Sequence, residues 1–275
     1  MASVDETTTT SRPPPAVIVF LHGYLGFVQA PFLPFVRNFR GLEAEMRRLG
    51  HACLFPALPR TESVATRAAA LAGALEATGE RPIVLVGHSM GGLDARFLAR
   101  ERDPRRRVRT VVTVGTPHRG TPVADWALSG ELAFPWSLVA RWRPALEDLT
   151  PEACDRRNER LIDREDVTYL SCAGERPPSH LPWPLADYAR RMRAQHGDND
   201  GLVPVTSARW GRFLGVHQAD HVELIGWRLP RWAGRDGGAF DHLRLYRNLL
   251  SQALAAPDAP NLDDGKGHHT ESTAG

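Results

Sequence analysis

Short, continuously apolar runs alternate with longer amphipathic segments along most of the chain. The runs AVIVFL at 16–21, IVLVG at 83–87 and VRTVVTV at 108–114 are rich in β-branched residues. Runs of this length and composition predict strands that are buried on both faces of a sheet. Similar but weaker runs at 51–55 and 167–172 predict two further strands.

The segments around these strands space their apolar residues as amphipathic helices do. The predicted helices span 39–49, 64–78, 91–101 and 242–254. Gly50 and Gly79 close the first two, and Asp241 is the expected N-cap of the last. Strands that alternate with helices in this way predict an α/β protein with a mostly parallel, doubly wound sheet.

Residues 121–165 interrupt this alternation. The segment is rich in apolar and aromatic residues: Trp126, Phe134, Pro135, Trp136, Leu138, Val139 and Trp142. A helical piece then begins near Thr150. Because the segment follows a strand, we expect a helical cap, or lid, over the carboxyl edge of the sheet. An additional structural layer of helices is the alternative.

Composition sets limits on function. The chain of 275 residues is 42% apolar and 24% charged, with a net charge of +2, as in a soluble globular protein without a need for nucleic acid. The basic run at 105–109 is interpreted as a solvated connection. The three cysteines are far apart and form no CxxC motif, so neither a zinc site nor a disulfide framework is expected.

The two ends of the chain differ from its middle. Residues 1–14 and 257–275 lack apolar periodicity and are expected to be disordered tails around one domain at 15–256. The N-terminal segment lacks the basic start and apolar run of a signal peptide, and no apolar stretch approaches the roughly 20 residues of a membrane span. A cytoplasmic location is therefore expected.

The stretch IVLVGHSMGG at 83–92 contains the pattern GxSxG around Ser89. A predicted strand precedes this serine and a predicted helix follows it, which is the context of a nucleophile elbow. The backbone N–H of Met90 then lies at a helix N-terminus, where an oxyanion is stabilised. A turn serine without a chemical role is the alternative.

A second oxyanion donor is expected in the loop after the first strand, where the chain reads His22-Gly23-Tyr24. Gly23 allows the backbone to approach the reacting atoms closely, so the N–H of Tyr24 is the candidate donor. His22 precedes the serine in the chain, and its expected role is to hold this loop by hydrogen bonding.

A nucleophilic serine needs a histidine base and an acid that orients it, in the chain order serine, acid, histidine. Asp200 is favoured over Asp198 as the acid, because an apolar stretch follows it and can anchor it. A last short strand is expected around Val216-His217-Gln218. His221 is favoured as the base, because it lies in the loop after that strand, whereas His217 is expected on the strand itself and His242 at the start of a helix.

Five motifs together resemble a triacylglycerol lipase of the α/β-hydrolase superfamily, in consistent order over about residues 16–250. They are LHGYLGF, VGHSMGGLDARFL, TVGTPHRGTPVADW, NDGLVPVTSARWG and ADHVELIGW. The resemblance implies an α/β-hydrolase fold, a lid at 121–165 and an ester substrate with a fatty acyl chain. It also implies a triad of Ser89, Asp200 and His221 with the amides of Tyr24 and Met90 as oxyanion donors, and no cofactor in the chemistry.

Two features depart from this resemblance. Secreted relatives usually carry a signal peptide, which is missing here. Many also bind a structural calcium ion through an acidic residue two positions after the catalytic histidine. Glu223 occupies that position, and Asp187 is the candidate for a second ligand, so calcium stays open as a possible cofactor.

Other functions fit the same motifs. A thioesterase or a phospholipase/acyltransferase would use the same triad, and a hydrolase-fold protein without activity could use its cap to bind a partner. The expected partner is a small-molecule or lipid ester. For an ester met at a lipid–water interface, Trp126, Trp136 and Trp142 are expected to help a lid to open.

Overall fold

The computed structural model describes residues 15–24, 39–132, 143–181, 183, 185–228 and 240–255. The predicted tails at 1–14 and 257–275 lie outside these residues. Among the described helices, none is long and apolar enough to cross a membrane.

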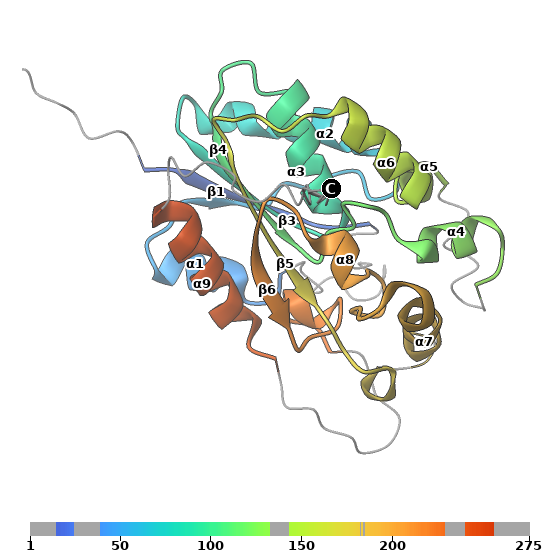
Figure 1. The fold of residues 1–275 in the computed structure, drawn as a ribbon. Coiled ribbons are helices and arrows are strands. Elements are labelled where there is room, and N and C mark those ends of the chain that lie inside the picture. The colour runs from blue at the N-terminus through green and yellow to red at the C-terminus, as the bar shows by residue number, and fades with distance from the viewer. Residues whose placement is uncertain are drawn as a thin grey trace, which may run out of the picture.

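Within the described ranges, one parallel sheet of six strands forms the centre of the molecule (Figure 1). The strands are β1 Val17–Leu21, β2 Cys53–Leu54, β3 Ile83–His88, β4 Val108–Val114, β5 Thr168–Gly174 and β6 Arg212–His217. Their order is β2-β1-β3-β4-β5-β6, and every neighbouring pair is parallel. This arrangement confirms the predicted α/β class and parallel sheet.

Helices cover both faces of the sheet (Figure 1). They are α1 Leu42–Arg48 and α9 His242–Ala255 on one face, and α2 Val64–Leu75 and α3 Met90–Glu101 on the other. Along β3, Val84 and Val86 pack toward α1 and α9, whereas Ile83 and Leu85 pack toward α2 and α3. Because both faces of the strand are covered, its first four positions, from Ile83 to Val86, are all apolar.

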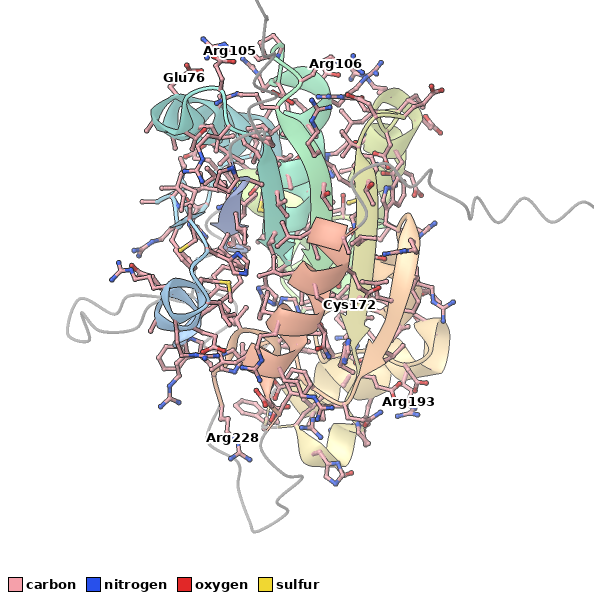
Figure 2. All side chains as sticks on the ribbon, turned by 90° about the vertical axis from the view of Figure 1, so that its left-hand side faces the viewer. Glu76, Arg105, Arg106, Cys172, Arg193 and Arg228 are labelled. Carbon is pink, nitrogen blue, oxygen red and sulfur yellow. The ribbon has the colours of Figure 1, made fainter. Side chains whose placement is uncertain are left out.

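The free, buried Cys172 of β5 belongs to the apolar cluster that joins the sheet to α9, and Figure 2 places it near the middle of the sheet. Arg105 and Arg106 lie far from it, at one end of the molecule (Figure 2). Arg105 pairs with Glu76, and Arg106 pairs with Asp166, and all four side chains are accessible to solvent. Arg105 and Arg106 therefore agree with the predicted solvated connection. Arg107 does not, because its side chain is buried and donates to the carbonyl of Leu75 and to the hydroxyl of Thr78.

The described residues of the interruption at 121–165 form three short helices: α4 Pro122–Leu128, α5 Arg143–Glu147 and α6 Pro151–Arg160. Thr150 caps α6, since its hydroxyl accepts the N–H of Ala153 at 3.2 Å. Trp136 and Trp142 lie outside the described residues, as do the other residues at 133–142.

Several boundaries differ from the predictions. The helix predicted at 39–49 begins only at Leu42, because Phe39 and Gly41 have positive φ angles. The strand predicted at 51–55 is reduced to Cys53–Leu54. No helix was predicted between β5 and β6, where the structure has α7 Leu185–His196 and α8 Val205–Ala208. Among the residues that the structure describes, the other short helices are single turns of 3-10 helix: η1 Glu76–Thr78, η3 Pro178–His180 and η4 Glu223–Ile225.

Candidate active site

Ser89 lies in a sharp turn between β3 and α3, with φ 55° and ψ −130°. This backbone conformation is costly for a residue with a side chain, and it occurs most often at functional sites. The glycines beside it are required by close packing. A Cβ at Gly87 would collide with the backbone of Gly91 and Gly92, and a Cβ at Gly91 would collide with the carbonyl of Leu21. The predicted elbow is therefore present.

The loop after β1 lies against this serine. A Cβ at Gly23 would lie 2.6 Å from the Cβ of Ser89 and 3.1 Å from its Oγ, so only glycine lets the backbone come so close. Tyr24 follows and lines the same cavity as Ser89. Met90 is the first residue of α3, so its N–H is one of the helix N-terminal amides without an intrahelical acceptor.

His22 holds this loop through both ring nitrogens. Its Nδ1–H donates to the carbonyl of Gly23 at 2.9 Å, and its Nε2 accepts the N–H of Leu58 at 3.3 Å. Burial, together with the charge of Arg67, lowers the pKa of His22 to about 4. The ring is therefore neutral at physiological pH, and its hydrogen bonds are those of a loop-holding residue.

A buried ion pair that the sequence analysis missed supports the same loop. Arg67 of α2 donates to Asp94 of α3, and also to the carbonyl of His22 at 2.6 Å. Both charged side chains are fully buried, and this desolvation raises the pKa of Asp94 to about 6. The signal in the sequence was an arginine on the apolar face of α2, in register with Val64 and Leu71.

The structure brings Asp200 and His221 together. Nδ1 of His221 donates to Oδ2 of Asp200 at 2.7 Å, and both side chains are buried. Oδ1 of Asp200 accepts the N–H groups of Leu202 and Val203 at 3.0 and 2.7 Å, which fixes the carboxylate. The backbone N–H of His221 also donates to the carbonyl of Asp200 at 3.0 Å.

The alternative residues lie elsewhere. Asp198 is exposed and pairs with Arg193 at 2.6 Å. His217 is on β6, and His242 begins α9, where its Nε2 lies 2.6 Å from the carbonyl of Arg40. None of these interactions joins Asp198, His217 or His242 to Ser89.

His88, the residue before the serine, supports the loop that carries His221. Its Nε2–H donates to the carbonyl of His221 at 2.9 Å, and the two rings lie 4.5 Å apart. Complete burial lowers the pKa of His88 well below its ordinary value. His88 is therefore a neutral hydrogen-bond donor that fixes the backbone of His221.

Ser89 and His221 line one cavity of about 260 Å³ at the carboxyl edge of the sheet, where ligands bind in open parallel sheets. Its wall is mostly apolar and comes largely from the interrupting segment and from residues near α7: Pro117, Thr121, Val123, Ala124, Ala127, Leu132, Leu146, Leu149, Tyr188, Leu202, Val203, Val222 and Ile225. Trp126 is absent from this wall. Its ring packs beside Tyr188 and under the guanidinium of Arg191.

The residues considered for calcium do not fit a cation site. The buried carboxylate of Glu223 accepts Nε of Arg176 at 2.9 Å and the N–H of Asp220 at 3.0 Å, so a guanidinium already lies against it. Asp187 is exposed and pairs with Arg190 on its own helix. Within the described part of the chain, no group of three or more His, Cys, Asp or Glu side chains could hold a metal ion.

Known proteins are similar to this chain, some over part of its length and others over most of it. A family model described as a PGAP1-like alpha/beta domain matches residues 71–198. Triacylglycerol lipase 2 of Saccharomyces cerevisiae is 23% identical over 282 residues, which span 79% of this chain and 82% of the relative. A triacylglycerol lipase of Burkholderia plantarii is 46% identical over 52 residues, or 19% of this chain and 14% of the relative.

Solved structures give the same fold. The mature lipase BlEst2 of Bacillus licheniformis superposes with a TM-score of 0.66 at 25% identity, covering 78% of this chain and 89% of that one. A metagenomic carboxyl esterase superposes with the same TM-score at 21% identity, covering 90% and 78%. These similarities confirm the predicted α/β-hydrolase fold.

Proposed function

We propose that this chain, a lipase-like carboxylic-ester hydrolase of the α/β-hydrolase superfamily, cleaves esters of fatty acyl chains through Ser89, His221 and Asp200. The observation that carries the proposal is one arrangement. Ser89 lies at a strained elbow and shares an apolar cavity with His221, and Nδ1 of His221 is bonded to the buried carboxylate of Asp200. Nucleophile, orienting acid and base follow each other along the chain in the order that this fold requires.

In the first step, the hydroxyl oxygen of Ser89 attacks the ester carbonyl carbon while Nε2 of His221 takes its proton. Asp200 accepts a hydrogen bond from Nδ1–H and stabilises the imidazolium that forms. The backbone amides of Tyr24 and Met90 donate to the oxyanion of the tetrahedral intermediate, and one such donor is worth about 3 kcal/mol in comparable sites. The intermediate collapses, the alcohol leaves with the proton from His221, and an acyl-enzyme remains.

In the second step, water replaces the alcohol. His221 takes a proton from a water molecule as its oxygen attacks the acyl carbon, and the proton returns to Oγ of Ser89 when the acid leaves. This chemistry needs no cofactor. His22 and His88 stay neutral throughout and act only on the backbone of the two loops.

The preference for an acyl chain rests on the cavity. Around Ser89 and His221, the cavity wall consists mostly of aliphatic and aromatic side chains. Such a wall favours burial of the hydrocarbon chain of a fatty acid over binding of a polar acid. The segment 121–165 supplies much of that wall, and we assign it the role of a lid.

The test is hydrolysis of p-nitrophenyl esters with acyl chains from acetyl to palmitoyl, beside the matching acyl-CoA thioesters and a phospholipid. We expect oxygen esters of apolar acids to be cleaved with the highest kcat/KM, and Ser89→Ala to lose this activity. Preferred cleavage of the thioester or the phospholipid would assign the triad to a different acyl substrate. Full activity of Ser89→Ala would overturn the mechanism.

A further inference from the structure

A buried ion pair lies between the loop of the acid and the loop of the base. Arg176 follows the end of β5, and Glu223 lies two residues after His221. Nε of Arg176 donates to Oε2 of Glu223 at 2.9 Å, and the two side chains are only 7% and 1% exposed. Charges buried to this extent are held in a fixed geometry by their partner, because separation would leave each one unpaired.

On one side, the pair closes the turn that carries His221. Oε2 of Glu223 also accepts the N–H of Asp220 at 3.0 Å. Oδ1 of Asp220 in turn accepts the N–H groups of Val222 and Glu223 at 3.0 and 2.8 Å. The residues before and after His221 are thus bonded to each other, and Arg176 bonds to the carboxylate at the centre of this turn.

On the other side, the same arginine holds the loop of the acid. The backbone N–H of Arg176 donates to the carbonyl of Asn199 at 2.9 Å, directly before Asp200. Asn199 is itself fixed, since its amide donates to the carbonyl of Ala189 at 3.2 Å and accepts the N–H of Gly201 at 3.0 Å. Arg176 therefore bonds to the neighbours of both Asp200 and His221.

We propose that Arg176, through its ion pair with Glu223 and its backbone bond to Asn199, is a positioning residue that holds the base loop against the acid loop. Its guanidinium is the cation that cross-links the two loops, so the site requires no divalent metal ion. This inference rests on the proposed function, because it takes Asp200 and His221 as the catalytic pair.

The first test compares kcat and KM of Arg176→Met, Arg176→Lys and Glu223→Gln with those of the unmodified protein on one p-nitrophenyl ester. A displaced base lowers kcat by about 100-fold without changing substrate contacts, so KM stays within about threefold. Arg176→Lys keeps the charge and restores part of kcat, although a lysine lacks the rigid fork of arginine.

A matched control is the buried ion pair of Arg164 and Asp103, whose N–O distance is also 2.9 Å. This pair links the segment after α3 to the segment before β5. Asp103→Asn is expected to lower the melting temperature about as much as Glu223→Gln, while its kcat stays within about twofold of the unmodified protein. An equal loss of kcat in this control, or an unchanged kcat in folded Arg176→Met, would overturn the positioning role.

The second test needs no variant. The melting temperature and kcat of the unmodified protein are measured with EDTA and with millimolar calcium chloride, and both are expected to stay constant. A loss with EDTA that calcium restores would overturn the claim that the guanidinium is the cross-linking cation. Failure of the proposed function itself would look different, because Ser89→Ala would then keep its activity whatever happens at Arg176.

Discussion

At the scale of single residues, hydrogen bonding separates three histidines that line the same cavity. His22 and His88 bond to backbone groups of their loops, and burial lowers the pKa of each. His221 is the one whose ring is paired with a carboxylate, that of Asp200. A carboxylate partner sets the tautomer and stabilises the protonated ring, so the base is recognised by its partner and not by its distance from the serine in sequence.

Two acids of one loop allow a direct comparison. In Asp200→Asn, the side-chain amide faces Nδ1 of His221 and favours the wrong tautomer, so we expect kcat to fall by about 10⁴-fold. The oxygen of the new side chain still accepts the amides of Leu202 and Val203, which preserves the loop. Asp198→Asn is the control, since this exposed residue pairs with Arg193, and its kcat should be unchanged. The reverse ranking in steady-state kinetics would assign the acid to Asp198.

His118 carries a prediction about pH and stability. Complete burial, with Arg96 nearby, lowers its pKa well below the ordinary value of 6.5. Below pH 6.5 the unfolded chain binds a proton at this ring and the folded protein does not, so acid favours the unfolded state. Between pH 6.5 and 5, the unmodified protein should therefore lose more unfolding free energy than His118→Gln, by at most about 1.6 kcal/mol. Urea unfolding of both proteins across this range measures the difference, and identical pH slopes would contradict it.

At the scale of elements, the strands were predicted best. Their apolar runs are continuous because both faces are covered, and this signal is independent of distant contacts. The start of α1 and the shortening of β2 depend on loop conformation, such as the positive φ of Phe39, which the apolar pattern does not reveal. The ion pairs of Arg67 and Arg176 were also missed, because their partners lie 27 and 47 residues away.

Gly73 offers a test of helix α2 as a stability element. It is an exposed residue in the middle of the helix, and a Cβ added there would meet no atom within 4 Å. Gly73→Ala should raise the unfolding free energy by about 1 kcal/mol, because alanine loses less backbone entropy in a helix. Urea unfolding checks the change, and kcat should stay constant. A decrease in stability would show that this part of α2 is not helical.

At the scale of the whole molecule, the site combines segments that are far apart in the chain, from His22 to His221. Their order was predictable from the fold, because parallel strands end at one edge of the sheet. The composition of the cavity wall was not predictable in this way, since Tyr188 and Leu202 come from a region in which no helix was predicted. The sequence thus indicated how a bond is broken more clearly than which acid is bound.

Ala127 tests whether the cavity holds the acyl chain. It is a small, buried residue of α4 in the cavity wall. Ala127→Leu fills part of the cavity, so kcat/KM for octanoyl esters should fall by about tenfold, while acetyl esters change by less than about threefold. A p-nitrophenyl ester series measures both. An equal loss for short and long chains would place the acyl group outside this cavity.

The central claim is that Ser89 is the nucleophile that forms the acyl-enzyme. Incubation with a p-nitrophenyl alkylphosphonate, followed by peptide mass spectrometry, tests it most directly. We expect one phosphonyl group per chain, attached to Ser89, with loss of ester hydrolysis in proportion to labelling. Stoichiometric labelling of another residue, or full activity after complete labelling of Ser89, would contradict the claim.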